Sequence, residues 1–137
     1  MVFGDCALID DSSNMICTLE APSEFSLKQL IEEGNYIPQP SVFFTRNAFE
    51  IVGGLNEALH YSMDYELWIK VGLHYQVGKV HAVLSSFRQQ ANQKTFKSSN
   101  NQYRENLRIR ARYGSVKQKY LLVRHLIAEK VKRYPIL

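Results

Sequence analysis

The sequence has no long hydrophobic run, and this absence excludes one class of protein. It contains no stretch of about 18 uninterrupted apolar residues, so no membrane-spanning helix is expected. The opening residues "MVFGDCALIDD" also lack the basic and then apolar order of a secretory signal peptide. A cytoplasmic protein is therefore predicted.

Cysteine is scarce as well. The chain has two cysteines, Cys6 and Cys17, which are too few for a disulfide framework. Structural zinc sites need about four ligands at closer spacing. We therefore interpret both as reduced residues of strands and predict no metal site from them.

Positive charge is scarce in the first three quarters of the chain and dense at its end. Residues 1–102 carry seven Lys/Arg and eleven Asp/Glu, a net charge of −4, whereas residues 103–137 carry ten and two, a net of +8. Such a segment can be a solvated helix face, or it can contact anionic lipid, nucleic acid or a phosphorylated substrate. Nucleic-acid binding is not predicted, because no recognition motif accompanies the charge.

The first half of the chain alternates strand and helix signals. Two apolar runs around "DSSN" predict a β-hairpin or two neighbouring strands over residues 1–21. Ser26 and Gln29 form a capping box for a short helix that Gly34 ends. The strand "SVFF" follows, and Asn47 can cap the short helix "AFEIV", which ends at a pair of glycines.

The second half is richer in helix signals. The apolar spacing predicts a helix over 64–75, and "QVGKVHAVLSSFR" predicts one or two strands before a polar loop over 89–102. A basic helix over 103–113 ends at Gly114, and a second capping box starts another helix at residue 115. That last helix carries one apolar stripe: Val116, Tyr120, Val123, Ile127, Val131 and Tyr134.

The order of five motifs, "GD…ID", "IPQPSVFFTR", "AFEIVGGLNEAL", "MDYELW" and "SFRQQANQKT", resembles the second half of family 2 glycosyltransferases, which have the GT-A fold. The resemblance runs from about residue 2 to residue 96, and its most specific part is "GGLNEALHYSMDYELWIKV". It implies an α/β protein: a partial GT-A fold in residues 1–97, with a mixed sheet of short strands flanked by helices. Residues 98–137 would form a basic helical extension.

The resemblance implies a catalytic role for Asp64. In inverting members the matching aspartate is the general base that takes a proton from the acceptor hydroxyl. An aspartate at a helix N-terminus stays ionised, because the helix dipole favours its charge. That position also weakens it as a base, so burial or a neighbouring carboxylate such as Glu66 must oppose the effect. The alternative is that Asp64 only caps the helix.

Three further residues are candidates for the acceptor site. Trp68 lies one turn after Asp64 and can stack on a sugar face, or it can belong to the core. Gln39, between two prolines, can present its amide to substrate or can be a turn residue. Glu66 completes the expected acceptor-binding set.

Four residues are candidates for contacts with the donor phosphates. Arg46 follows the "SVFF" strand where the family often has a basic residue, although a surface ion pair would explain it too. The loop "SFRQQANQKT" resembles the family's segment over the donor diphosphate, which offers Arg88 and Lys94 for charge-assisted hydrogen bonds. Gln90 takes the place of the family's histidine, which removes the best metal-type ligand.

The family's N-terminal nucleotide-binding region and its Asp-x-Asp metal motif have no counterpart in the sequence. We therefore expect an incomplete glycosyltransferase, inactive alone, that binds a saccharide or lipid-linked acceptor. No cofactor is expected on this chain alone, whereas Mn²⁺ or Mg²⁺ would serve the complete enzyme. A separate N-terminal half is an expected partner, and an uncovered edge of the opening strand predicts a homodimer.

An alternative function is a non-enzymatic interaction module. Its basic helices over 103–134 would contact an anionic membrane surface, at the cytoplasmic side of the membrane, or a groove on a protein partner.

Overall fold

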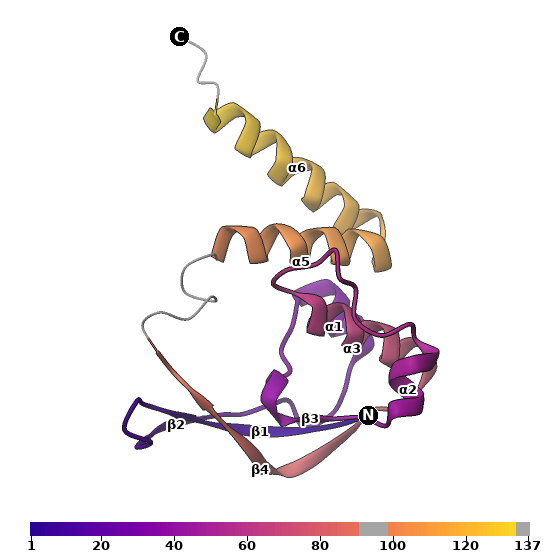
Figure 1. The fold of residues 1–137 in the computed structure, drawn as a ribbon. Helices are drawn as coiled ribbons and strands as arrows, with labels where there is room; N and C mark the ends of the chain where they lie inside the picture. The colour runs from indigo at the N-terminus through magenta and orange to yellow at the C-terminus, as the bar shows by residue number, and fades with distance from the viewer. Residues whose placement is uncertain (91–98, 134–137) are drawn as a thin grey trace.

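Four strands form one mixed sheet with β1 at its centre (Figure 1). The computed structural model describes residues 1–90 and 99–133, except for the side chains of residue 99 and residues 130–133. The strands are β1 (Val2–Ile9), β2 (Met15–Leu19), β3 (Val42–Phe43) and β4 (Gly78–Arg88). β1 pairs antiparallel with β2 and with β3, and it pairs parallel with β4 along its whole length.

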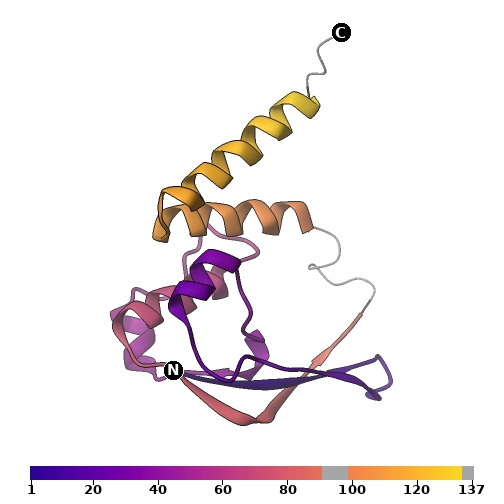
Figure 2. The ribbon, with the colours of Figure 1, turned by 180° about the vertical axis from the view of Figure 1, so that it is seen from behind.

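The helices gather on one face of this sheet (Figures 1 and 2). They are α1 (Leu27–Glu33), α2 (Arg46–Ile51) and α3 (Met63–His74), with a 3₁₀ turn η1 (Gln39–Ser41) before β3. α5 (Ser99–Tyr113) crosses on the side away from the sheet, and α6 (Val116–Arg133) projects from its end. The predicted α/β class is confirmed, whereas the partial GT-A fold stays a prediction.

The core lies between the sheet and the helices. Phe3 of β1 is fully buried and packs edge-on against Phe25, with ring centroids 6.5 Å apart. α3 supplies much of the remaining core, because its apolar residues recur at three- and four-residue steps. Tyr65 is buried too, and its hydroxyl donates to the Leu30 carbonyl of α1 at 2.7 Å. α3 is therefore fixed on the side that packs against the sheet and α1.

The capping signals predict the first residue of some helices correctly and of others wrongly. Ser26 does cap α1, since its hydroxyl accepts the backbone N–H of Gln29 at 3.2 Å. The cap of α2 is Thr45 rather than Asn47. α3 begins at Met63 with Ser62 at the N-cap position, so the alternative that Asp64 is the helix cap is wrong. Asp64 is instead the second residue of the first turn.

α5 begins at Ser99, inside the segment expected to be a polar loop, and it belongs to the core. Ile109 is 2% exposed and lies in the same apolar cluster as the α3 residues. The guanidinium of Arg110 reaches α1, where its Nε donates to the Ile31 carbonyl at 3.0 Å. α5 therefore packs on the same core as α1 and α3, and the expected division between residues 97 and 98 stays a prediction.

The uncovered strand edge lies elsewhere than expected. β1 is the central strand, whereas β4 pairs only with β1 among the strands that the structure describes. The prediction that the opening strand leaves an open edge is therefore wrong. Among the described strands, β2, β3 and β4 each have a second edge without a partner strand.

Candidate functional site

A cavity of about 380 Å³ opens beside the first two turns of α3. This volume falls within the range of small-molecule sites, about 300–1,000 Å³. The walls come from η1, the residue after β3, α2, the loop that leads to α3, the start of α3, and α5. The lining residues are Gln39, Phe44, Phe49, Leu55, His60, Tyr61, Met63, Asp64, Leu67, Trp68 and Gln102.

Asp64 supplies the only carboxylate among the residues that line this cavity. Its Oδ1 accepts the backbone N–H of Tyr65 at 2.8 Å. Burial raises the pKa of Asp64 above its ordinary value, and the hydrogen bonds from backbone N–H groups only partly oppose that rise. The carboxylate therefore holds a proton more strongly than an exposed aspartate would. Burial, rather than a neighbouring carboxylate, makes Asp64 a stronger base than an exposed aspartate.

The cavity wall beside Asp64 is aromatic. Trp68 is 3% exposed and its ring centroid lies 5.9 Å from that of Phe44. Phe44 in turn stacks on Phe49, with centroids 5.8 Å apart and an interplanar angle of 14°. Trp68 thus belongs to the core and also lines the cavity, so the two interpretations of this residue are compatible. Rings of this kind present flat apolar surface to a ligand.

Gln39 reaches the same cavity from a distant part of the chain. It is the first residue of η1 and its side chain is exposed. It lines the cavity together with residues at the start of α3. The structure therefore brings together three of the four residues expected at the acceptor site: Gln39, Asp64 and Trp68.

Glu66 does not join them. Its carboxylate is 2% exposed on another side of α3, where Oε1 lies 3.3 Å from Arg112 Nη1 and 3.3 Å from the Tyr113 hydroxyl. Residues two positions apart on a helix point in nearly opposite directions. The expected place of Glu66 in the acceptor site, beside Asp64, is therefore corrected: it joins α3 to the end of α5.

Of the four candidates for phosphate contacts, the three that the structure describes do not line the cavity. Arg46 is exposed and lies 3.8 Å from the Glu50 carboxylate. Arg88 donates to the carbonyls of Asp10 and Asp11, at 2.7 and 3.0 Å, and so holds the turn between β1 and β2. Gln90 is exposed at the end of the described segment, and Lys94 lies outside the described residues.

Glu105 of α5 positions the cavity loop, and the sequence analysis missed it. Its carboxylate accepts three consecutive backbone N–H groups, those of His60, Tyr61 and Ser62, at 2.9, 2.8 and 3.0 Å. His60 and Tyr61 line the cavity, and Ser62 directly precedes α3. Only the charge of Glu105 was visible in the sequence, because its partners lie about forty-five positions away.

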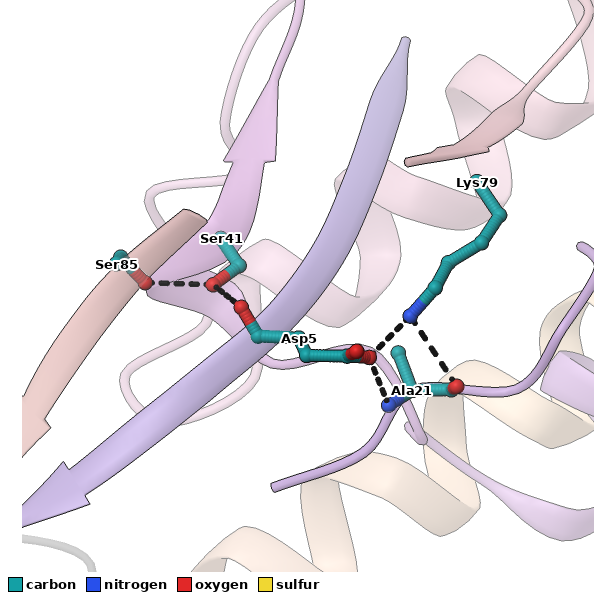
Figure 3. A network of polar contacts seen from close by, with 5 residues as sticks. All are labelled: Asp5, Ala21, Ser41, Lys79 and Ser85. Carbon is teal, nitrogen blue, oxygen red and sulfur yellow. Dashed lines mark hydrogen bonds and ion pairs between the residues drawn. The ribbon is translucent and has the colours of Figure 1, made fainter. Parts of the chain in front are cut away.

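Asp5 takes part in a polar network within the sheet (Figure 3). Its carboxylate pairs with the Lys79 ammonium and accepts the Ala21 N–H at 2.9 Å. The pairing with Lys79 lowers the pKa of Asp5, because it stabilises the ionised form. On the other side of β1, the Ser41 hydroxyl donates to the Asp5 carbonyl at 2.7 Å. The network ties η1, which carries Gln39, to the centre of the sheet.

Metal-type side chains are dispersed. No group of three or more His, Cys, Asp or Glu residues that could hold a metal ion occurs within residues 1–90 and 99–133. No helix in the described part of the chain is long and apolar enough to cross a membrane. No protein-family model matches the chain, and a search of the curated proteins found no matching relative.

Proposed function

We propose that this chain forms the acceptor-binding part of an inverting glycosyltransferase with the GT-A fold and that Asp64 is its general base. One observation carries the proposal: a partly buried aspartate with a raised pKa lines an aromatic cavity of ligand size. The motif order from the "PQP" segment to the "MDYELW" helix supports the same assignment.

The proposed reaction assigns one proton transfer to Asp64. As an acceptor hydroxyl oxygen attacks the anomeric carbon of the donor sugar, the carboxylate takes the hydroxyl proton. The bond from the anomeric carbon to the donor diphosphate breaks at the same time, and the diphosphate leaves with the bonding electrons. Burial favours this role, because a base of raised pKa accepts a proton more readily than an ordinary aspartate does.

The aromatic wall suits the acceptor. Trp68 and Phe44 can pack against the apolar C–H face of a sugar ring, and Gln39 can exchange hydrogen bonds with sugar hydroxyls at the rim. The described residues that line the cavity include no lysine or arginine to neutralise a diphosphate. We therefore assign the donor and its metal ion to residues outside this cavity, in a partner or another segment.

Tryptophan fluorescence tests the proposal directly. Trp68 is the single tryptophan of the chain, so its emission reports on this cavity. A panel of saccharides and lipid-linked sugars is titrated first, followed by nucleotide-sugars with and without Mn²⁺ or Mg²⁺. We expect saturable changes with members of the first group and no metal-dependent change with the second.

Two results would contradict the proposal. Metal-dependent binding of a nucleotide-sugar in this cavity would make it a donor site. Absence of any response to sugars from a cooperatively folded protein would leave the cavity without its proposed ligand. In any preparation that transfers sugar, Asp64→Asn should lower kcat by roughly 10²- to 10⁴-fold, the usual contribution of a general base, with little change in KM.

A further inference from the structure

The outer face of α6 carries exposed apolar side chains that no other described element covers. Val116, Tyr120, Val123 and Ile127 are 79%, 62%, 52% and 58% exposed. They recur at steps of four, three and four residues and therefore form one line along the helix, which we name the outer stripe. In both ribbon views α6 starts near the end of α5 and runs back over that helix, on the side away from the sheet (Figures 1 and 2).

The opposite face of α6 packs on α5. Gln118 is 1% exposed, and the His125 ring lies edge-on to Tyr103 with centroids 5.0 Å apart. Glu129 is the only acidic residue of α6, and its carboxylate lies 3.3 Å from Arg104 of α5 and 3.4 Å from His125. The only acidic side chain of α6 is therefore paired on the side that faces α5.

Basic residues border the outer stripe on both edges. Lys117 and Arg124 each follow a stripe residue by one position, so the 100° step of a helix places both on the same edge. Lys119 precedes Tyr120 by one position and lies on the opposite edge. All three are exposed. An apolar line with cations along both edges is typical of helices that lie in a membrane interface, with lysine and arginine stems extending to the headgroups.

We propose that the outer stripe of α6 docks in the plane of an anionic membrane surface. The positive charge beside the stripe favours an anionic membrane over a second copy of the chain as its partner. Two copies joined through it would bring their Lys117, Lys119 and Arg124 side chains together, and like charges at an interface disfavour association. Anionic headgroups complement the same residues. The inference depends on α6 alone and stands independently of the proposed glycosyl transfer.

Vesicle flotation tests the inference with the full chain. Vesicles of phosphatidylcholine alone are compared with vesicles that also contain phosphatidylglycerol, each over a range of salt concentrations. We expect partitioning into the anionic vesicles that weakens as salt rises, and little partitioning into the neutral ones. Equal binding to both, or no binding to either, would overturn the inference.

Two matched pairs of variants locate the contact. The double variant Lys117→Gln and Arg124→Gln should lower partitioning by about 25-fold, since each basic residue near an anionic surface contributes about fivefold. Lys28→Gln with Arg108→Gln removes the same amount of charge from exposed sites on α1 and α5, and this control should change the partitioning little. Val123→Ser with Ile127→Ser should abolish binding, whereas Ile51→Ser with Leu73→Ser, which removes exposed apolar side chains on α2 and α3, should not.

Self-association gives the remaining readout. Sedimentation of the wild-type chain and of the Val123→Ser, Ile127→Ser variant is compared without vesicles. The same oligomeric state is expected for both. A dimer that exists only in the wild type would mean that the stripe binds a second copy, and this would overturn the membrane assignment.

Discussion

Asp64 and Glu66 stand two residues apart on α3, and their carboxylates serve different parts of the molecule. Asp64 lines the aromatic cavity, whereas Glu66 lies against Arg112 and Tyr113 of α5. Glu66 therefore does not account for the raised pKa of Asp64, whose first cause is burial. Glu66 attaches α3 to α5, and the proposed chemistry rests on Asp64 alone.

Replacing Asp64 by asparagine should stabilise the protein at neutral pH. Because burial raises the folded-state pKa above its ordinary value near 3.8, the folded protein binds this proton more tightly than the unfolded chain. The resulting stability is fully present below the ordinary value and is lost as pH rises through the folded-state pKa. Asp64→Asn should thus raise the free energy of unfolding at about pH 7, with the difference closing near about pH 3.

Urea denaturation at several pH values measures this difference. Asp11→Asn is the matched control, because Asp11 is exposed in the turn between β1 and β2. A variant that is less stable than the wild type at neutral pH would show that ionised Asp64 stabilises α3 instead, as a charge at the helix N-terminus would.

Phe44→Ala should weaken sugar binding more than it weakens the fold. Phe44 bridges Phe49 and Trp68 on the cavity wall, and it is 38% exposed. Loss of its stacking surface should lower affinity about tenfold, which is about 1.4 kcal/mol. The cost in unfolding free energy should be about 1–2 kcal/mol, less than for a fully buried phenylalanine.

The neighbouring Phe43→Ala is the control for this change. Phe43 is 54% exposed and does not line the cavity. Fluorescence titration of Trp68 in both variants gives the affinities. Equal losses of affinity would place the sugar away from the aromatic wall.

Glu105→Gln should loosen the loop that leads into α3. The carboxylate accepts three backbone N–H groups with its two oxygens, whereas an amide has one acceptor oxygen. Loss of charge-assisted hydrogen bonds should cost about 2 kcal/mol of unfolding free energy. Amide hydrogen exchange at residues 60–62 should accelerate as well, and Glu24→Gln at an exposed site should change neither. Unchanged exchange would show that Glu105 does not hold this loop.

Asp5→Asn should destabilise the protein at neutral pH, and the loss should shrink in acid. Pairing with Lys79 lowers the pKa of Asp5, so its stability is present above the ordinary value near 3.8 and is lost as pH falls through the lower, folded-state value. The variant also leaves Lys79, whose side chain is 4% exposed, without its carboxylate.

Lys79→Met added to Asp5→Asn tests that explanation. Removing the second charge should recover part of the stability, since the cost of an unpaired buried ammonium disappears. Thermal or urea unfolding measures the stability of Asp5→Asn and of the double variant. If the double variant is no more stable than Asp5→Asn, the pairing itself is not what the single substitution disturbs.

Dimer formation, if it follows the sheet, should use the second edge of β4. Val83 is 51% exposed on this strand, and lysine at an edge position opposes strand pairing between chains. Val83→Lys should convert a dimer into a monomer in sedimentation, whereas Ile16→Lys on β2 should not. The reverse result would assign the contact to β2.

The local signals of the sequence identified most elements but not all their limits. Ser26 could be read as a cap because its hydroxyl and the N–H that it contacts are three residues apart. The start of α5 could not be predicted from the sequence. Polar residues such as Asn100 and Asn101 favour loops unless the packing of the following turns stabilises the helix. α2 begins at Arg46, so Asn47 lies inside the helix and the cap is Thr45, whose hydroxyl accepts the Ala48 N–H.

The sequence by itself determined the α/β class, the placement of Asp64 and Trp68 one turn apart on a helix, and the apolar stripe of the last helix. These features depend on periodicity and on contacts within a few residues. Only the tertiary structure decided that Gln39 meets Asp64 at a cavity, that Glu105 holds residues 60–62, and that Asp5 pairs with Lys79. Those pairs are separated by tens of residues, so their geometry exists only after the sheet and helices have closed on one core.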